Sequence, residues 1–391
     1  MKAIVNTKLI MEDGIIWDGA LLIGDDGLIA AADWADKVTV PEGAEIIDAG
    51  GRYTAPGLID IHTHGSDDTG FHEDPAACAE YFVKHGQTTV LPTFYCTLTL
   101  EQMLEGADKV RKASKTGVGR IMDGLYMEGP YMNGAGSNQK YIKWTGDILP
   151  EEYVPLYEGL GDMVRVWAID PARKGIRGFM DYVREQNPKA IFAIGHSNCT
   201  MEECKKLSGY NLKIRTHHSD AGKAPGRAQG TPGAGGDEYS LYNPDVYSEV
   251  IVDENGVHVV PDLLKMIIRT KGVERICLIT DSMGSKDDFR NNEKEGIWYG
   301  PDLNYDYRGY LAGSRLTLDN ACRNVMKHTG YGLCHAIRMA TLNPAKALGI
   351  ADRVGSLEAG KKANLIIIDD MVHVEKVFLE GGLVAENGKL C

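Results

Sequence analysis

The 391-residue sequence lacks the features that would place it in a membrane, in an oxidising compartment or on a polyanion. No apolar run is long enough to cross a bilayer, and the first residues lack the apolar core of a signal peptide. The eight cysteines are scattered singly without a Cys-x-x-Cys pair, which is typical of reduced cytosolic thiols rather than of a disulfide framework. The formal net charge of −13 argues against binding to nucleic acid or to an anionic membrane surface. We therefore expect a cytoplasmic protein.

Internal repeats and low-complexity tracts are also absent, and no Gly-x-Gly-x-x-Gly motif follows the first strand-like run of the middle of the chain. The last absence disfavours a dinucleotide-binding, doubly wound open sheet, which is the main competitor for the fold. Hydrophobic residues make up 43% and charged residues 25%, as is usual for a globular protein. The length suffices for one large domain and a smaller module.

The middle of the chain, residues 54–353, alternates between strand-like and helix-like segments. Eight such strands with intervening helices are the number required for a (β/α)8 TIM-like barrel in the α/β class. Residues 1–53 and 354–391 read instead as short strands and turns, which predicts one small β-sandwich domain built from both termini. The strand-like runs are 57–62, 88–93, 121–128, 163–170, 190–196, 212–217, 248–253 and 276–281.

Side chains that can bind a metal ion lie at the ends of several of these runs. A barrel of parallel strands brings the carboxyl ends of its strands into one ring, however far apart they lie in sequence. Imidazole and carboxylate groups that converge there are typical of a site for zinc or for another divalent ion such as iron or manganese. We predict a site of one or two ions, and therefore a hydrolase, from His62, His64, Glu128, His196, His217 and Asp281.

Each of these residues also has a structural alternative. His62 and His64 share one face of a strand, but an isolated His-x-His pair can equally be two surface or capping groups. Glu128 could be a buried carboxylate paired with a lysine or arginine. His217 and His218 are adjacent and face opposite sides of a strand, so only one of them can be a ligand.

Asp281 closes the last strand-like run. Beside a metal ion that lowers the pKa of water to about 7, this carboxylate could accept the water proton and later deliver it to a leaving group. The alternative is an aspartate that caps the following helix.

His258, after the seventh run, could orient a substrate or stabilise an oxyanion, or could be a polar loop residue. The Gly/Pro-rich stretch 222–240 is interpreted as an active-site loop, in which Arg227 could clamp an anionic group.

The residues above belong to longer motifs, which follow one another as "APGLIDIHTHG", "MEGPYMN", "GHSNCT", "RTHHSDA", "NGVHVVPD", "LITDSMG" and "LAGSRLTLDNACRN". In this order, the motifs resemble those of the amidohydrolase superfamily, specifically the N-acetylglucosamine-6-phosphate deacetylases, over nearly the whole chain. The resemblance implies that Glu128, His196 and His217 bind the primary divalent metal, that His62 and His64 are second-metal ligands, and that Asp281 is the general base and acid. It implies that Arg227 reaches the sugar phosphate from the neighbouring subunit of a homodimer. The resemblance also implies that the sugar site is lined by Ala221, His258, Leu311, Ala312 and Gly313.

The sequence departs from the family pattern at two positions that would face the substrate. Asp220 precedes Ala221 where the family has asparagine, and Ser137 stands where it has histidine. The expected reaction is hydrolysis of the acetyl amide of N-acetylglucosamine 6-phosphate to acetate and glucosamine 6-phosphate. The alternatives are a different N-acyl substrate, such as N-acetylgalactosamine 6-phosphate, an unphosphorylated N-acyl sugar or an N-acyl amino acid, and a catalytically silent metal-binding homologue.

Overall fold

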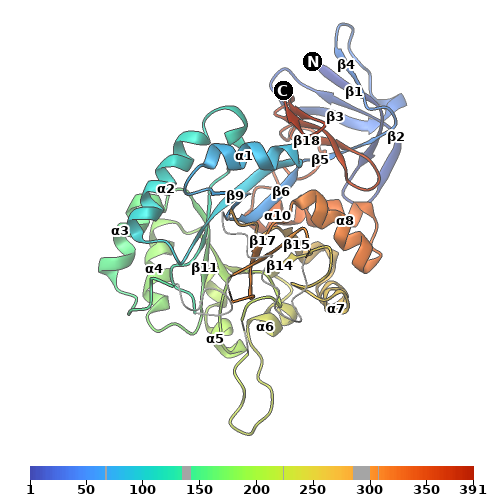
Figure 1. The fold of residues 1–391 in the computed structure, drawn as a ribbon. Helices are drawn as coiled ribbons and strands as arrows, with labels where there is room; N and C mark the ends of the chain where they lie inside the picture. The colour runs from blue at the N-terminus through green and yellow to red at the C-terminus, as the bar shows by residue number, and fades with distance from the viewer. Residues whose placement is uncertain (67, 134–141, 223, 285–299, 307) are drawn as a thin grey trace.

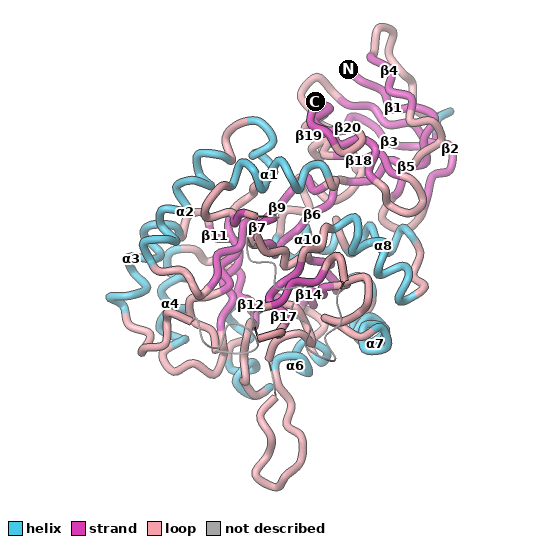
Figure 2. Tube along the Cα trace, in the orientation of Figure 1, coloured by secondary structure: helices cyan, strands magenta, loops and turns pink. Residues whose placement is uncertain are grey.

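The computed structural model describes the whole chain apart from residues 67, 134–141, 223, 285–299 and 307. The chain forms a large α/β body and a smaller β body, and both termini lie in the smaller one (Figure 1). Helices cover the outside of the strands in the large body, whereas the smaller body is made of strands and loops with one short 3-10 helix, η1 (Ala35–Lys37) (Figure 2). Among the described residues, no helix is long and apolar enough to span a membrane.

The large body is the predicted barrel. Its eight strands pair in parallel in the order β15-β14-β13-β12-β11-β10-β9-β6, so all but the last pair are neighbours in sequence. Every one of them lies within or overlaps a predicted strand-like run. Their bounds are β6 (Leu58–Thr63), β9 (Gln87–Tyr95), β10 (Leu125–Glu128), β11 (Val164–Ile169), β12 (Ile191–Ile194), β13 (Leu212–Arg215), β14 (Tyr247–Ile251) and β15 (Ile276–Ile279).

Helices follow the strands and bury one face against them. In α4, for example, Phe179, Met180 and Val183 recur at helical spacing and are fully buried. Capping boxes begin α2 and α5, at Thr99 and Thr200 respectively. The helices are α1 (Pro75–Lys84), α2 (Leu100–Ala113), α3 (Pro150–Leu160), α4 (Ile176–Gln186), α5 (Met201–Lys206), α6 (Gly236–Tyr242), α7 (Pro261–Lys271), α8 (Leu318–Thr329), α9 (Leu333–Met339) and α10 (Leu342–Leu348).

The smaller body is a nine-stranded sheet to which both ends of the chain contribute, as predicted. Strand β18 of the C-terminal part pairs antiparallel with β5 of the N-terminal part, which joins the two. The boundaries at residues 53 and 353 stay a prediction. The strands are β1 (Lys2–Ile10), β2 (Ile15–Ile23), β3 (Ile29–Trp34), β4 (Glu45–Asp48), β5 (Tyr53–Pro56), β18 (Leu365–Ile368), β19 (Val374–Leu379), β20 (Gly382–Glu386) and β21 (Lys389–Leu390).

Two short hairpins stand beside the carboxyl ends of the barrel strands. The first, β7 (Gly65–Ser66) with β8 (Thr69–Gly70), follows β6 directly. The second, β16 (Leu303–Tyr305) with β17 (Leu311–Ser314), joins the end of β15, because the Ser314 N–H donates to the Asp281 carbonyl at 2.8 Å. The loop before α6 projects away from the barrel (Figure 1). Residues 236–240, predicted as loop, belong to α6, because the Glu238 side chain accepts from the Gly235 N–H and caps the helix.

Candidate metal centre

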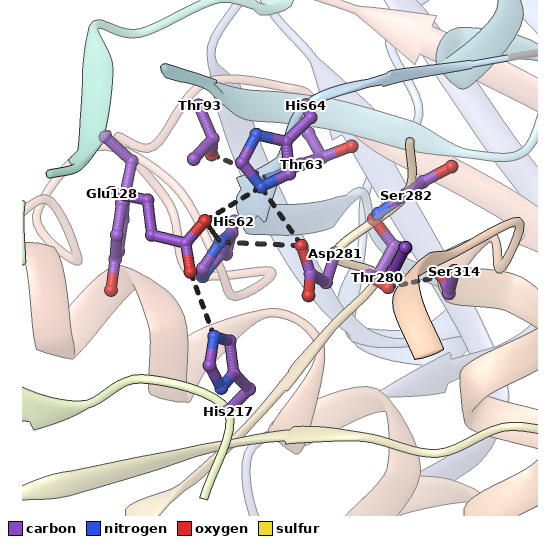
Figure 3. Close-up of polar contacts among 12 residues, drawn as sticks. His62, Thr63, His64, Thr93, Glu128, His217, Thr280, Asp281, Ser282 and Ser314 are labelled. Atoms are coloured by element: carbon purple, nitrogen blue, oxygen red, sulfur yellow. Dashed lines mark hydrogen bonds and ion pairs between the residues drawn. The ribbon is translucent and has the colours of Figure 1, made fainter. Parts of the chain in front are cut away.

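The six predicted metal-site residues come together at the carboxyl ends of five barrel strands. Glu128 is the last residue of β10, whereas His196, His217 and Asp281 each lie two residues beyond β12, β13 and β15. His62 is part of β6. All six side chains are buried, and their polar ends point toward one another (Figure 3 labels His62, His64, Glu128, His217 and Asp281). Core strands therefore set the position of each group, although the first and the last of them, His62 and Asp281, lie more than 200 residues apart in the chain.

Glu128 is shared by two groups of potential ligands. Its Oε1 lies 2.9 Å from the Nε2 of both His196 and His217. Its Oε2 lies 3.1 Å from the His64 Nε2 and 3.6 Å from the His62 Nε2. Asp281 completes the second group, with Oδ1 3.1 Å from the His64 Nε2 and 3.6 Å from the His62 Nε2. Within each group the ligand atoms all lie within 4.8 Å of one another.

Three of these residues adopt a backbone conformation that is uncommon outside glycine. The φ angles of His196, His217 and Asp281 are 30°, 26° and 48°. Such positive values cost free energy in a β-carbon residue and tend to cluster at functional sites. Because all three occur at the same point after a strand, we attribute them to the turn of the chain that brings each side chain into the ring.

The electrostatics of the cluster fit a cation. Burial alone would raise the pKa of the Glu128 carboxyl, but His62 and His196 hold it well below its usual value. Burial raises the pKa of Asp281, but the hydrogen bond with His64 and the charges of His62 and His64 together lower it. Among the residues that the structure describes, only imidazoles form ion pairs with these two carboxylates. Two buried anions without a lysine or arginine partner are costly unless a cation accompanies them.

An unpartnered nitrogen atom in the cluster also fits a divalent ion. The His62 Nε2 faces both carboxylates, yet it is buried and makes no hydrogen bond within the described chain. Unsatisfied buried nitrogen atoms are rare and require an explanation such as an ion. Imidazole nitrogen and carboxylate oxygen are the ligands that zinc-type ions take when they serve in hydrolysis.

Two buried carboxylates behind the cluster were not predicted. Asp60 lies at the seam where β6 meets β15, and accepts hydrogen bonds from the Thr280 hydroxyl at 2.6 Å and the Gln87 amide at 3.1 Å. Burial raises its pKa to about 7, although the bonds from Thr280 and His62 act in the opposite direction. Glu249 in β14 accepts from His62. A carboxylate inside an apolar strand run is the sequence signal that could have identified both residues.

The residues predicted to face the substrate lie in several parts of the structure. Asp220 Oδ1 lies 3.4 Å from the Nδ1 of the buried His258. Burial acts to raise the pKa of the Asp220 carboxyl, but His258 together with His217 and His196 lowers it. The Ala221 carbonyl is fixed by the buried guanidinium of Arg215 at 2.9 Å. Ser137 lies outside the described residues. The structure places His218 outside the cluster, with Nδ1 2.9 Å from the Ser219 hydroxyl.

Residues Leu311, Ala312 and Gly313 form most of β17, beside Asp281. Gly313 has a φ of 61°, and a β-carbon at this position would stand 2.6 Å from the Asp281 carbonyl oxygen, so only glycine fits without a shift. Arg227 is not brought to the cluster of its own chain. It lies in the exposed tip of the projecting loop, where the Gly230 N–H donates to its carbonyl at 2.9 Å.

Comparisons with known proteins identify the family of the chain. An N-acetylglucosamine-6-phosphate deacetylase of Haemophilus influenzae is 28% identical over 93% of this chain and 94% of its own length. An N-acetylgalactosamine-6-phosphate deacetylase of Escherichia coli O157:H7 is 27% identical over 97% of this chain and 98% of its own. The crystal structure of N-acetylglucosamine-6-phosphate deacetylase from Pasteurella multocida is similar with a TM-score of 0.84, at 25% identity over 99% of this chain and 100% of that one. The sequence pattern of the Amidohydrolase family matches residues 53–384, so the chain belongs to this family.

Proposed function

We propose that this chain is a divalent-metal-dependent hydrolase that removes the acetyl group from an N-acetylated amino sugar 6-phosphate, with N-acetylglucosamine 6-phosphate as the first candidate. The observation that carries the proposal is the buried pair of ligand groups joined by Glu128. The names of the similar proteins from Haemophilus influenzae and Pasteurella multocida supply the substrate class. The enzyme is proposed to be cytoplasmic and to act as a homodimer.

Two sets of residues would hold the metal. Glu128, His196 and His217 would bind the primary ion, and His62 and His64 would bind a second one with Glu128 and Asp281 at its edge. Zinc is the proposed ion, with iron or manganese as alternatives that use the same donors. When bound, such an ion supplies Lewis acidity toward the acetyl carbonyl and makes a water molecule acidic enough to react at neutral pH.

Asp281 is proposed to carry the proton. Its lowered pKa keeps the carboxylate ionised, so that Oδ1 can accept a proton from the attacking water as the water oxygen bonds to the acetyl carbon. The resulting tetrahedral intermediate breaks its carbon–nitrogen bond as Asp281 returns that proton to the amine nitrogen. Acetate and the free amino sugar phosphate are the products, and Asp281 ends the cycle ionised.

The sugar is proposed to lie between the cluster and the residues around it. His258, Asp220 and Ala221 would line one side of the sugar site, and Leu311–Gly313 of β17 the other, with Ser137 as a further substrate-facing position. The projecting loop leaves Arg227 exposed, which fits a role in binding the phosphate of a substrate held by a neighbouring subunit. The site of one chain would then be complete only in a homodimer.

The test is acetate release from four compounds by the zinc-loaded protein. These are N-acetylglucosamine 6-phosphate, N-acetylgalactosamine 6-phosphate and the two unphosphorylated sugars. We expect fast, phosphate-dependent release from the first. Preference for the galactosamine compound would favour the second candidate, which the Escherichia coli O157:H7 relative supports. No release from any of the four, by protein shown to contain metal, would contradict the proposal.

A further inference from the structure

Glu249 lies behind the metal cluster, in the middle of β14, and is fully buried. One oxygen of its carboxylate, Oε2, stands 3.1 Å from the His62 Nδ1 and accepts from the His217 backbone N–H at 3.3 Å. The His62 ring is also stacked on Tyr126, with ring centroids 4.5 Å apart and an angle of 27° between the planes. The imidazole is thus held at one edge and on one face by groups that belong to two other strands.

The contact with Glu249 determines which nitrogen of His62 carries the proton. A carboxylate can only accept a hydrogen bond, so Nδ1 carries a proton, and in the neutral ring the Nε2 lone pair points into the cluster. There Nε2 faces Glu128 and Asp281, each with an oxygen at 3.6 Å, which is too long for a hydrogen bond. This nitrogen is therefore presented to the space between two carboxylates in the form that binds a metal ion.

The two halves of the cluster differ in this respect. The His217 ring also turns its Nε2 to Glu128, but its Nδ1 is buried without a hydrogen-bond partner among the described residues. Glu249 reaches His217 only through the main chain. A carboxylate–imidazole–metal arrangement, which orients the ring and raises its basicity, is thus built for His62 and not for His217.

We infer that Glu249 is a positioning residue that determines the binding of an ion by the His62 and His64 half of the cluster. The inference deepens the proposed function and rests on its metal cluster. Through His62, Glu249 would act on the second ion much more than on the ion held by Glu128, His196 and His217. Its removal would leave a protein that folds and retains one ion.

The first experiment measures metal per chain for the wild type, Glu249→Gln and Glu249→Leu at a series of buffered zinc concentrations. Loss of such an outer partner typically weakens metal binding 10- to 100-fold. We expect this loss for the weaker of two ions in both variants, with the stronger ion changed less than about threefold and the melting temperature of metal-free Glu249→Gln close to that of the metal-free wild type. Glu254→Gln, the same change in the loop after the same strand, is the control and should match the wild type. Both ions retained, or both lost together with a large fall in that melting temperature, would overturn the inference.

The second experiment tests whether Glu249 acts through His62. In a His62→Ala background, adding Glu249→Gln should cause no further loss of metal, because the ring that it orients is gone. Loss of the remaining ion in the double variant would overturn the inference, as would a wild type whose metal content does not depend on His62. A wild type that binds no divalent ion at all would instead overturn the proposed function, so the two failures are distinguishable.

Discussion

The metal cluster and the projecting loop before α6 differ in what holds their functional groups in place. In the cluster, every side chain is buried and lies within or just after a core strand, and Glu128 contacts histidines of both halves. In the loop, residues 226–232 are all exposed, and the main chain of Arg227 bonds to Gly230 and Thr231 of the same turn. The groups proposed for the reaction therefore lie together within one chain, whereas we propose that the group for the phosphate comes from a second copy.

Substitution of Arg227 tests this difference most strongly. Arg227→Ala should raise KM for the phosphorylated substrate about 10- to 100-fold, because one charge-assisted contact with a phosphate contributes about 1.5–3 kcal/mol. The value of kcat and the metal content should stay near those of the wild type, since the cluster is untouched. Steady-state kinetics with the phosphorylated and the unphosphorylated sugar measure the effect, and Gln229→Ala in the same loop is the control. An equal rise for both sugars would show that Arg227 does not bind the phosphate.

Mixing two impaired chains, at a substrate concentration well below the KM of Arg227→Ala, shows which subunit supplies Arg227. Hybrids of Arg227→Ala with Asp281→Asn chains should contain one site with both residues intact and recover part of the wild-type activity. Recovery contradicts a role of Arg227 within its own chain. A mixture with only the sum of the two parent activities, although hybrids form, would contradict a role across subunits.

Asp220→Asn should have a smaller effect on KM than Arg227→Ala. It tests a charged group that is proposed to line the sugar site of its own chain. The carboxylate pairs with His258 and would repel a phosphate in the same site. A unit charge at about 8 Å in water contributes about 0.5 kcal/mol, so its removal should lower KM for the phosphorylated sugar roughly two- to fivefold. KM for the unphosphorylated sugar serves as the reference. A rise in both KM values would show that the pair with His258 matters more than the charge.

The barrel could be predicted from the sequence because its eight parallel strands are continuous apolar runs separated by amphipathic helices. The residues at the ends of those runs could be predicted for the same reason, since a barrel fixes where its strand ends meet. The turn of the chain after β12, β13 and β15 could not, because a positive φ at a histidine or aspartate has no signature in composition.

The groups behind the cluster were missed for a different reason. Asp60 and Glu249 lie inside strands and point to partners on other strands, so their contacts depend on the register of the sheet and on strand order. The position of Arg227 could not be derived either. Its loop projects from the fold, and a loop that makes few contacts with its own chain carries no periodic pattern that would place it.

The central claim is that Asp281 transfers the proton in a metal-dependent hydrolysis, and Asp281→Asn tests it most directly when acetate release and metal content are measured on the same sample. Asparagine keeps the size of the side chain but cannot accept the water proton at neutral pH. We predict that release from N-acetylglucosamine 6-phosphate falls by about 10²- to 10⁴-fold, the usual contribution of a general base, while the ion held by Glu128, His196 and His217 is retained. Wild-type turnover by metal-loaded Asp281→Asn would contradict the account.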